Sequence, residues 1–552
     1  MGPMCRVSIL LLALLVPVPP GAYAETRETL FIGQFLTLDP AQPTAEALVV
    51  SNGRIVMAGK RVDAERQAGS AARRVVIDGF AVPGLADAHI HVTSVGESLS
   101  RLNLQGLSKE QVLRRVKAAA RNAPAAAWIR GGGWDEGFWR PEAFPTAREL
   151  DAVSAGHAVV LDRIDGHSTW VNSKVLELAG IGRGTPDPDG GVIRRDPGGA
   201  PTGLLVDNAL NLLDAVLPKT TPADQERYIR TALAQFARWG LTSVHDAGVD
   251  LETIAIYKSL LARDELTLRV YAMALGERAR EHYLASGPEL DLGNGMLAVR
   301  SFKLLLDGAL GSRGAQLSEP YSDAPGDRGL ELIADADLDR VIQAALQKGF
   351  QVNTHAIGDR AVRRALDAFQ RAGVTAERRF RIEHASLVSD EDLPRFAKLG
   401  VIASMQPVFV GEYSRWAEDR VGSARVKWVL RTHDLLESGA AIASGSDYPD
   451  SDSGEPMAAL HCLVTRQSAM GLPPEGWHSE QRIDIDRSLR MLTAGAAFAA
   501  FQEKDLGALT AGRYADFTVL AENPRKVQPE ELRKIAVRMT VVGGRIVFDS
   551  AR

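Results

Sequence analysis

The sequence is poor in cysteine, because its 552 residues contain only two, Cys5 and Cys462. If the N-terminal segment that carries Cys5 is removed, one cysteine remains and no intramolecular disulfide can form. The mature chain is then expected to depend on packing, and on any metal that it binds, for its stability.

The N-terminus lacks an apolar run long enough to cross a membrane. Residues 7–16 are apolar and follow Arg6, but prolines interrupt the segment soon afterwards, so it falls short of the ~20 residues that span a bilayer. The small residues of Ala22-Tyr23-Ala24 are typical of a signal cleavage site. We therefore expect residues 1–24 to be a signal peptide. The mature protein would be periplasmic or secreted, with no stable membrane anchor.

The chain also lacks an excess of one charge. Its net charge of −5, with 24% charged and 45% hydrophobic residues, is ordinary for a soluble globular protein and gives no sign of a nucleic-acid partner. The length predicts three or four domains of about 150 residues each, unless an α/β barrel of about 250 residues takes most of the chain.

The middle of the chain favours the barrel. Apolar runs alternate there with helical stretches, the pattern of βα units around a parallel sheet. The candidate strands are residues 82–91, 242–246, 269–274, 299–306, 350–355, 380–384, 401–406 and 441–447. Eight parallel strands predict a closed, TIM-like (β/α)8 barrel of the α/β class, whose active site lies at the carboxyl ends of the strands.

The two ends of the chain have similar hairpin signatures. Turns at Asn52-Gly53 and Gly543-Gly544 separate short β-branched runs, which predicts hairpins that share one sheet or sandwich. We expect residues 25–81 and 507–552 to form a composite β-domain. Which strands pair cannot be deduced from the pattern, so two unrelated edge hairpins are the alternative.

The barrel region, residues 82–506, then contains a large insertion after its first strand, residues 93–240. Helix start signals occur in it at Ser108-x-x-Gln111 and Thr146-x-x-Glu149. Because barrel enzymes vary their chemistry through loops at this face, we interpret the insertion as a lid.

Two histidines end the first predicted strand. Since side chains alternate along a strand, His89 and His91 point to the same face and can bind one metal ion. A bare H-x-H motif is only a hypothesis, because two histidines on a half-exposed strand have the same spacing.

Other strands supply similar side chains. His355, His384 and Asp447 each fall at the carboxyl end of a predicted strand, and Lys303 lies inside an apolar strand, where an unpaired ammonium would be costly. Such side chains converging on one barrel mouth favour a metal-dependent active site over isolated structural residues.

The motifs around these residues closely resemble the amidohydrolase superfamily, and within it the branch that contains N-substituted formamide deformylase. The resemblance covers nearly all of the mature chain. It is carried by P-G-L-A-D-A-H-I-H (83–91), G-G-G-W-D-E (131–136), D-G-H-S-T-W-V-N-S (165–173), T-S-V-H-D-A-G (242–248), K-L-L-L-D-G-A-L-G-S-R-G-A (303–315), T-H-A-I-G-D (354–359), I-E-H-A (382–385) and S-G-S-D-Y-P (444–449).

The resemblance implies a ligand set and a reaction. His89 and His91 would bind one divalent metal, and His355 and His384 a second. Lys303 would bridge them after carboxylation by carbon dioxide, and Asp447 would be both ligand and general base. Relatives use one metal or two. Zinc suits such ligands and lowers the pKa of bound water to about 7. This implies hydrolysis of a C–N bond in a small N-acyl or N-substituted amide.

The insertion and the strand-end loops are expected to choose the substrate. An aromatic wall with a few polar groups suits an amide, although packing of the lid and helix capping would explain the same residues. The Arg313 guanidinium could hold a substrate carboxylate or pair with Asp307. The candidate substrate-binding residues are Trp134, Asp135, Asp165, His167, Asp307 and Arg313.

Other functions stay open at this point. The same site could hydrolyse a cyclic amide, a carbamate or an ester. From different classes, the chain could be a non-catalytic exported binding protein on a relic barrel, or a structural protein in which the barrel only supports the β-domain. The expected partner is a small-molecule substrate, and the sequence leaves a homo-oligomer open.

Overall fold

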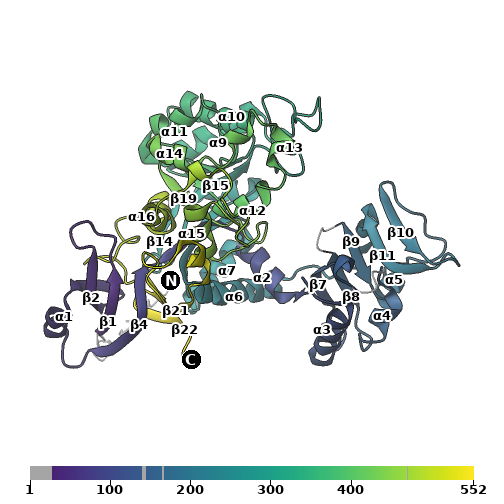
Figure 1. Cartoon of the computed structure of the whole chain (residues 1–552), viewed down its shortest axis with the longest axis horizontal. Helices are drawn as coiled ribbons and strands as arrows, with labels where there is room; N and C mark the ends of the chain where they lie inside the picture. Colours follow the sequence, from purple (N-terminus) through teal and green to yellow (C-terminus); the bar gives the residue numbers. More distant parts are fainter. Residues whose placement is uncertain (1–27, 140–143, 164–166, 469) are drawn as a thin grey trace, which may run out of the picture.

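The computed structural model describes residues 28–139, 144–163, 167–468 and 470–552 (Figure 1). The predicted signal peptide lies outside these residues. No helix among them combines the length and the apolar character that crossing a membrane requires.

A nearly closed parallel barrel forms the centre of the described chain, which confirms the predicted fold class. Each strand pairs with the next along the chain, and His89 O, at one end of this sheet, accepts a hydrogen bond from Asp447 N (2.7 Å) at the other. A short antiparallel strand, β14 (Glu289–Leu292), adds to β15. The eight barrel strands that the described residues contain are β5 (Leu85–Ile90), β12 (Leu241–Val249), β13 (Arg269–Ala274), β15 (Leu297–Leu305), β16 (Gln351–Ala356), β17 (Arg381–His384), β18 (Ile402–Met405) and β19 (Ile442–Ser444).

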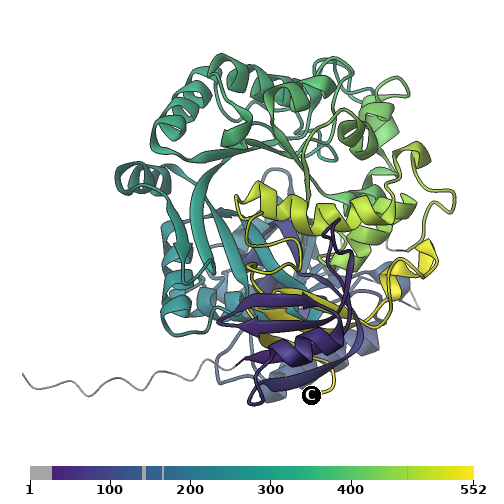
Figure 2. The ribbon, with the colours of Figure 1, turned by 90° about the vertical axis from the view of Figure 1, so that its left-hand side faces the viewer.

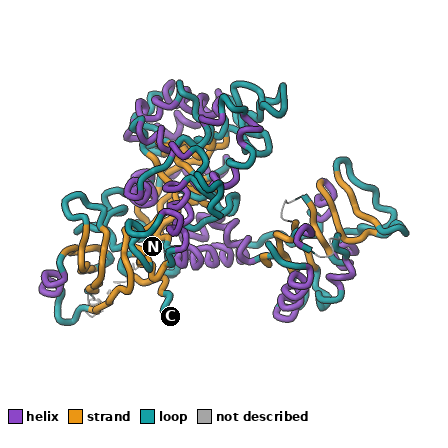
Figure 3. The backbone as a smooth tube through the Cα atoms, in the orientation of Figure 1, coloured by secondary structure: helices purple, strands orange, loops and turns teal. Residues whose placement is uncertain are grey.

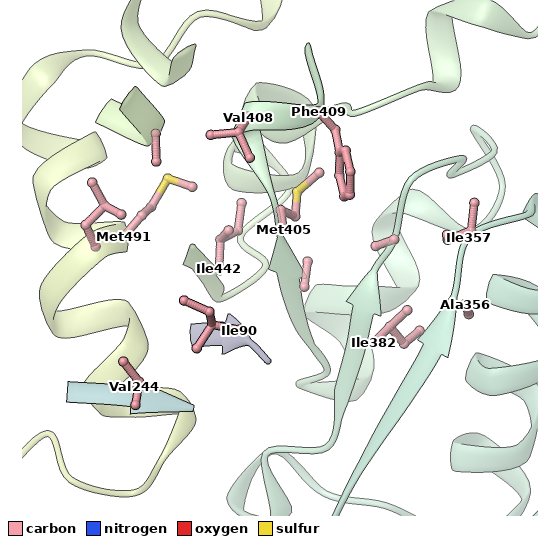
Figure 4. Packing of buried hydrophobic residues seen from close by; sticks show 14 of the residues in the cluster. Ile90, Val244, Ala356, Ile357, Ile382, Met405, Val408, Phe409, Ile442 and Met491 are labelled. Atoms are coloured by element: carbon pink, nitrogen blue, oxygen red, sulfur yellow. The ribbon is translucent and has the colours of Figure 1, made fainter. Parts of the chain in front are cut away.

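Alternation along the strands separates the barrel's apolar layer from its mouth. Ile90 and Ile382 are fully buried in the main hydrophobic cluster, whereas their neighbours His89 and Glu383 belong to the polar interior. Figure 4 shows Ile90 near Ile442, on the side where Met491 of a neighbouring helical segment packs. The period of two therefore buries one face of each strand and presents the other to the site.

Helices cover the outside of the barrel. On α9, Leu338, Val341, Ile342 and Ala345 are buried, the spacing of one apolar helix face. The main helices of this layer are α7 (Leu251–Ala262), α8 (Glu277–Ser286), α9 (Asp335–Lys348), α10 (Asp359–Arg371), α11 (Leu393–Leu399), α14 (Thr432–Glu437), α15 (Pro456–Thr465) and α16 (Ile485–Arg490). The short α12 (Val410–Tyr413) and α13 (Ala417–Val421) follow β18 at the mouth.

Strands from both chain ends form one sheet beside the barrel, as the hairpin signatures predict (Figure 2). β4 pairs in parallel with β1 and antiparallel with β20, which joins the two ends. Within the described residues the sheet has the order β22 (Arg545–Asp549), β21 (Val537–Val542), β20 (Phe517–Leu520), β4 (Arg73–Pro83), β1 (Thr29–Leu36), β2 (Thr44–Ser51) and β3 (Arg54–Gly59), with α1 (Arg61–Gln67) following β3.

Turn chemistry and one buried ion pair hold this sheet in place. Asn52 and Gly53 have φ of 51° and 76°, and Gly543 and Gly544 also have positive φ, so both predicted turns use the left-handed region. The guanidinium of Arg269, on β13, binds both carboxylate oxygens of Asp516 at 2.7 and 3.0 Å, which ties the barrel to the sheet.

The insertion forms a body of its own that projects to one side of the barrel (Figures 1 and 3). The predicted capping boxes at Ser108 and Thr146 are present. In the described chain its sheet has the order β10 (Gly191–Arg195), β11 (Pro201–Asp207), β9 (Ser168–Val171), β8 (Val159–Arg163), β7 (Ile129–Trp134) and β6 (Leu102–Asn103), and its helices include α3 (Lys109–Asn122), α4 (Ala147–Asp151) and α5 (Ser173–Leu178).

Two helices connect the insertion to the barrel. α2 (Val92–Ser100) leaves β5 and α6 (Pro222–Trp239) returns to β12. The helices touch at Gly96, where an added Cβ atom would lie 1.8 Å from the carbonyl oxygen of Tyr228. Glycine is therefore required at this crossing.

Candidate metal centre

A cavity of about 580 Å³ opens at the carboxyl ends of the barrel strands. The structure brings all six predicted metal ligands into its wall, although they come from five strands or the turns that follow them. They are His89, His91, Lys303, His355, His384 and Asp447.

A buried carboxylate on the side away from the cavity orients the His89 ring. Its Nδ1 atom lies 2.5 Å from Oε2 of Glu383, and both side chains are fully buried. Glu383 also pairs with Arg381, whose Nε lies 2.7 Å from Oε1. A carboxylate partner on one ring nitrogen leaves the other nitrogen free to bind a metal, and Nε2 of His89 faces the cavity group Lys303.

Asp447 lies among three imidazoles. Its Oδ1 atom is 3.1 Å from Nε2 of His91 and 3.2 Å from Nε2 of His89, and Oδ2 is 3.9 Å from Nδ1 of His384. Burial by itself raises the pKa of Asp447, but the neighbouring His89 and His384 outweigh it and hold the pKa well below its usual value. Its backbone has φ of 62°, the left-handed region that is uncommon for aspartate outside turns and functional sites.

His355 and His384 have buried nitrogens without a hydrogen-bond partner among the described residues. These are Nε2 of His355 and Nδ1 of His384. Burial lowers the pKa of His355 to about 3 and that of His384 well below its usual value. A neutral imidazole with an unused lone pair is the form that binds a metal.

The Lys303 ammonium is buried beside these imidazoles. Its Nζ atom lies 3.2 Å from Nε2 of His89, and its side chain is nearly inaccessible to solvent. Burial lowers the pKa of Lys303 from its usual value, because a desolvated ammonium is unfavourable. The lowered pKa favours the neutral amine, which is the nucleophilic form.

The donor atoms fit a divalent metal. Nitrogen and carboxylate ligand atoms of His89, His384 and Asp447 all lie within 4.8 Å of one another, and so do those of His91, Asp447 and Asp450. Imidazole and carboxylate together suit zinc and similar ions, and the first group includes His384, whose buried Nδ1 has no hydrogen-bond partner among the described residues. The residues present therefore fit the metal that the motifs imply.

The structure does not bring Trp134 and Asp135, two of the predicted substrate-binding residues, to this cavity. Trp134 is fully buried in the core of the insertion, where its indole N–H donates to Leu161 O (2.8 Å) and its ring stacks on Trp139. Asp135 caps the turn at Gly137 and pairs with Arg163. In this arrangement Trp134 and Asp135 stabilise the insertion, the alternative that the sequence had left open.

His167, another predicted substrate-binding residue, also lies away from the cavity wall. His167 is exposed and lies 2.9 Å from Asp207 within the insertion, and Asp165 lies outside the described residues. Among the described residues, the cavity wall contains none from the insertion.

Asp307 and Arg313 support the loops of the mouth. The buried carboxylate of Asp307 accepts hydrogen bonds from the backbone N–H groups of Gln316, Ile357 and Gly358, and it lies 3.6 Å from Nε2 of His355. Burial raises the pKa of Asp307 to about 7. Asp307 therefore holds the backbone around His355.

The alternative partner proposed for Arg313 is wrong, because Arg313 pairs with Asp323 at 2.9 Å and not with Asp307. Asp323 lies ten residues further along the chain, so the Arg313 guanidinium pairs with a local acid.

Sequence reasoning missed three acids of the site. Glu383 precedes His384 directly, and an Arg and a Glu two residues apart on a strand that ends in a predicted ligand, R-I-E-H, are a signal that could have found it. Asp450 follows Asp447 by three residues. Glu412 lies on α12, which follows β18, and the sequence pattern predicts no site residue on that strand.

A barrel with this cluster at its mouth is the arrangement of a metal-dependent hydrolase. A model of the amidohydrolase family matches residues 78–548. The chain belongs to the amidohydrolase family.

Relatives match the chain over most of its length. It is 32% identical to the protein LONG AFTER FAR-RED 3 of Arabidopsis thaliana, over 96% of this chain and 92% of that protein. It is 26% identical to the N-substituted formamide deformylase of Arthrobacter pascens, over 93% and 96% of the two chains. The crystal structure of an uncharacterized metal-dependent hydrolase from Pyrococcus horikoshii superposes with a TM-score of 0.75, at 29% identity, over 91% of this chain and 99% of the other.

Proposed function

We propose that this protein hydrolyses a C–N bond of a small N-acyl or N-substituted amide, with one or two zinc-type ions held by the six predicted ligands. The observation that carries the proposal is the grouping of His89, His384 and Asp447 within 4.8 Å, with Nδ1 of His384 unpartnered among the described residues. The formamide deformylase among the relatives supports the bond type.

A bound divalent ion supplies Lewis-acid chemistry, since it lowers the pKa of water and polarises a carbonyl group. Asp447 is the general base in this proposal. It is kept ionised by His89 and His384, so it can accept a proton from the attacking water and return it to the leaving nitrogen. Glu383 holds His89 in the tautomer that leaves Nε2 free.

Lys303 takes part as a carboxylated amine in this proposal. The neutral Nζ attacks the carbon of carbon dioxide. An N–C bond forms while one C=O π bond breaks and its electron pair moves to oxygen, and one proton leaves the nitrogen to solvent, which gives a carbamate. Burial of Lys303 and its lowered pKa support this step, because only the unprotonated amine has a lone pair.

The proposal includes export of the enzyme from the cytoplasm. The charged and apolar N-terminal segment with its small-residue end supports cleavage near Ala24 and a periplasmic or secreted enzyme. N-terminal sequencing of the protein recovered from outside the cytoplasm checks this, and an N-terminus that still carries residues 1–24 contradicts it.

The test of the activity is a panel of N-acyl amides incubated with zinc-loaded protein, with products identified by mass. Cyclic amides, carbamates and esters in the panel distinguish the variants of the reaction. The matched controls are the Asp447→Asn variant and protein treated with a chelator. Release of an amine and an acid by the loaded protein alone supports the proposal, and equal turnover in all three samples contradicts it.

A further inference from the structure

The cavity has a charge pattern beyond its metal ligands. Outside the six ligands, the charged side chains that line it within the described residues are Glu412 and Asp450, and both are acids. A substrate carboxylate would meet like charge here, and a substrate cation would meet opposite charge.

Glu412 has no cation of its own in the described structure. Its carboxylate forms neither a hydrogen bond nor an ion pair among the described residues. The charge of Arg415 acts on Glu412 from beyond ion-pair distance, but Arg415 is exposed, and the hydrogen bond between the two residues runs from the Arg415 backbone N–H to Glu412 O. Burial raises the pKa of Glu412, and the neighbouring Asp452 raises it further. A cation in the cavity would stabilise the ionised form of this half-buried acid.

Two arginines close to the same rim are already occupied. Arg313 and Arg420 both pair with Asp323, and Arg420 also donates to Gly311 O at 3.0 Å. An added Cβ atom on Gly311 would lie 3.7 Å from Oε1 of Glu412, so Glu412 faces the loop that these arginines support. Both guanidinium groups pair with Asp323, and neither forms an ion pair with Glu412 among the described residues.

Two aromatic residues close to Glu412 in the chain line the same cavity. Phe409 and Tyr413 both line the cavity, and their rings stack with centroids 5.4 Å apart. An acid and aromatic rings in one cavity are the combination that recognises alkylammonium groups. The unpartnered, buried Nδ1 of His384 lies in the same wall, so the reacting centre and this acid share one cavity of about 580 Å³, a size suited to a small molecule.

We propose that Glu412 makes the cavity select substrates that carry a positively charged amine in addition to the bond that is cleaved. The proposal rests on the proposed amide hydrolysis and names its substrate class. Asp450 adds to the negative potential, but its carboxylate lies within 4.8 Å of the ligand atoms of His91 and Asp447. Replacing it would disturb the metal, and Glu412 is therefore the residue to test.

The experiment compares three acetamides of similar shape, in which the amide nitrogen carries a 2-(trimethylammonio)ethyl, a 3,3-dimethylbutyl or a 2-carboxyethyl group. The first two differ by one charge at constant shape, and a quaternary ammonium cannot bind the metal itself. We expect kcat/KM to be highest for the cation and lowest for the carboxylate. In Glu412→Gln the ratio of cation to neutral compound should fall by about tenfold, with metal content unchanged.

Two further variants make the comparison specific. Glu412→Asp keeps the charge and should retain most of the preference. Glu281→Gln removes the same charge from an exposed position on α8 and should leave the ratio unchanged. An unchanged ratio in Glu412→Gln, or a parent that prefers the neutral or the carboxylate compound, overturns the proposal.

Binding measurements separate this proposal from the proposed function. If none of the acetamides is hydrolysed, that set gives no support to amide hydrolysis, and calorimetric titration of the same three compounds still reports the charge preference. Tighter binding of the cation that is lost in Glu412→Gln supports the selectivity, and equal binding of the cation and its neutral isostere contradicts it.

Discussion

Nδ1 of His89 lies 2.5 Å from Oε2 of Glu383, although 294 residues separate them in the chain. Both side chains are fully buried, and Arg381 balances the carboxylate from the next position on the same face of β17. The pair therefore fixes the ring that presents Nε2 to the metal centre. Partners of this kind orient metal ligands in many enzymes.

Glu383→Gln is expected to weaken metal binding by about 10–100-fold, because the amide no longer orients and polarises His89 as a carboxylate does. It should also lower the free energy of unfolding by about 3–5 kcal/mol, since it leaves the Arg381 charge buried and unpaired. Metal titration and urea unfolding measure the two effects. The exposed Glu281→Gln variant is the control, and parent-like metal affinity in Glu383→Gln would show that the carboxylate is not needed.

His89→Ala and His91→Ala should each lower metal content and activity while the barrel stays folded, because each imidazole is expected to supply one coordinate bond. Elemental analysis of the purified variants and circular dichroism check the two parts of this expectation. Full metal retention with full activity in both variants would remove these histidines from the ligand set.

Lys303→Ala should lose a bridging ligand and therefore retain less metal than the parent. If the missing group is a carboxylated amine, a short carboxylic acid such as acetate should restore part of the activity, because it replaces the bridging oxygens. The measurement is activity and metal content with and without the acid. A crystal structure of the metal-loaded parent with an unmodified Lys303 ammonium far from the ions would reject the bridge.

Asp447→Asn is expected to lower kcat by about 10²–10⁴-fold, the range for a lost general base, with a smaller change in metal content. The amide keeps the shape of the carboxylate and a weak oxygen ligand but cannot accept the proton. The acidic limb of the pH–rate profile should flatten in the variant. If the variant keeps its metal and turns over within a factor of about three of the parent, where chemistry limits the rate, Asp447 is not the base.

The barrel and the positions of its strand ends could be predicted from the sequence. Each strand is a local apolar run, and the period of two places His89 on the polar side and Ile90 in the apolar layer. Since the carboxyl ends of parallel strands meet at one mouth, local signals were enough to gather His355, His384 and Asp447 there.

Tertiary packing alone decided the partners of these residues and the place of the insertion. Residues 131–136, G-G-G-W-D-E, have the composition expected of a substrate wall, yet Trp134 ends strand β7 in the insertion's own core, because neither periodicity nor composition states which surface a segment packs against. Glu383 meets His89 only when β17 and β5 face each other across the nearly closed barrel. The sequence thus determined which side chains lie at the strand ends. The pairing of Glu383 with His89 and the position of Glu412 in the cavity wall depend instead on contacts between segments far apart in the chain.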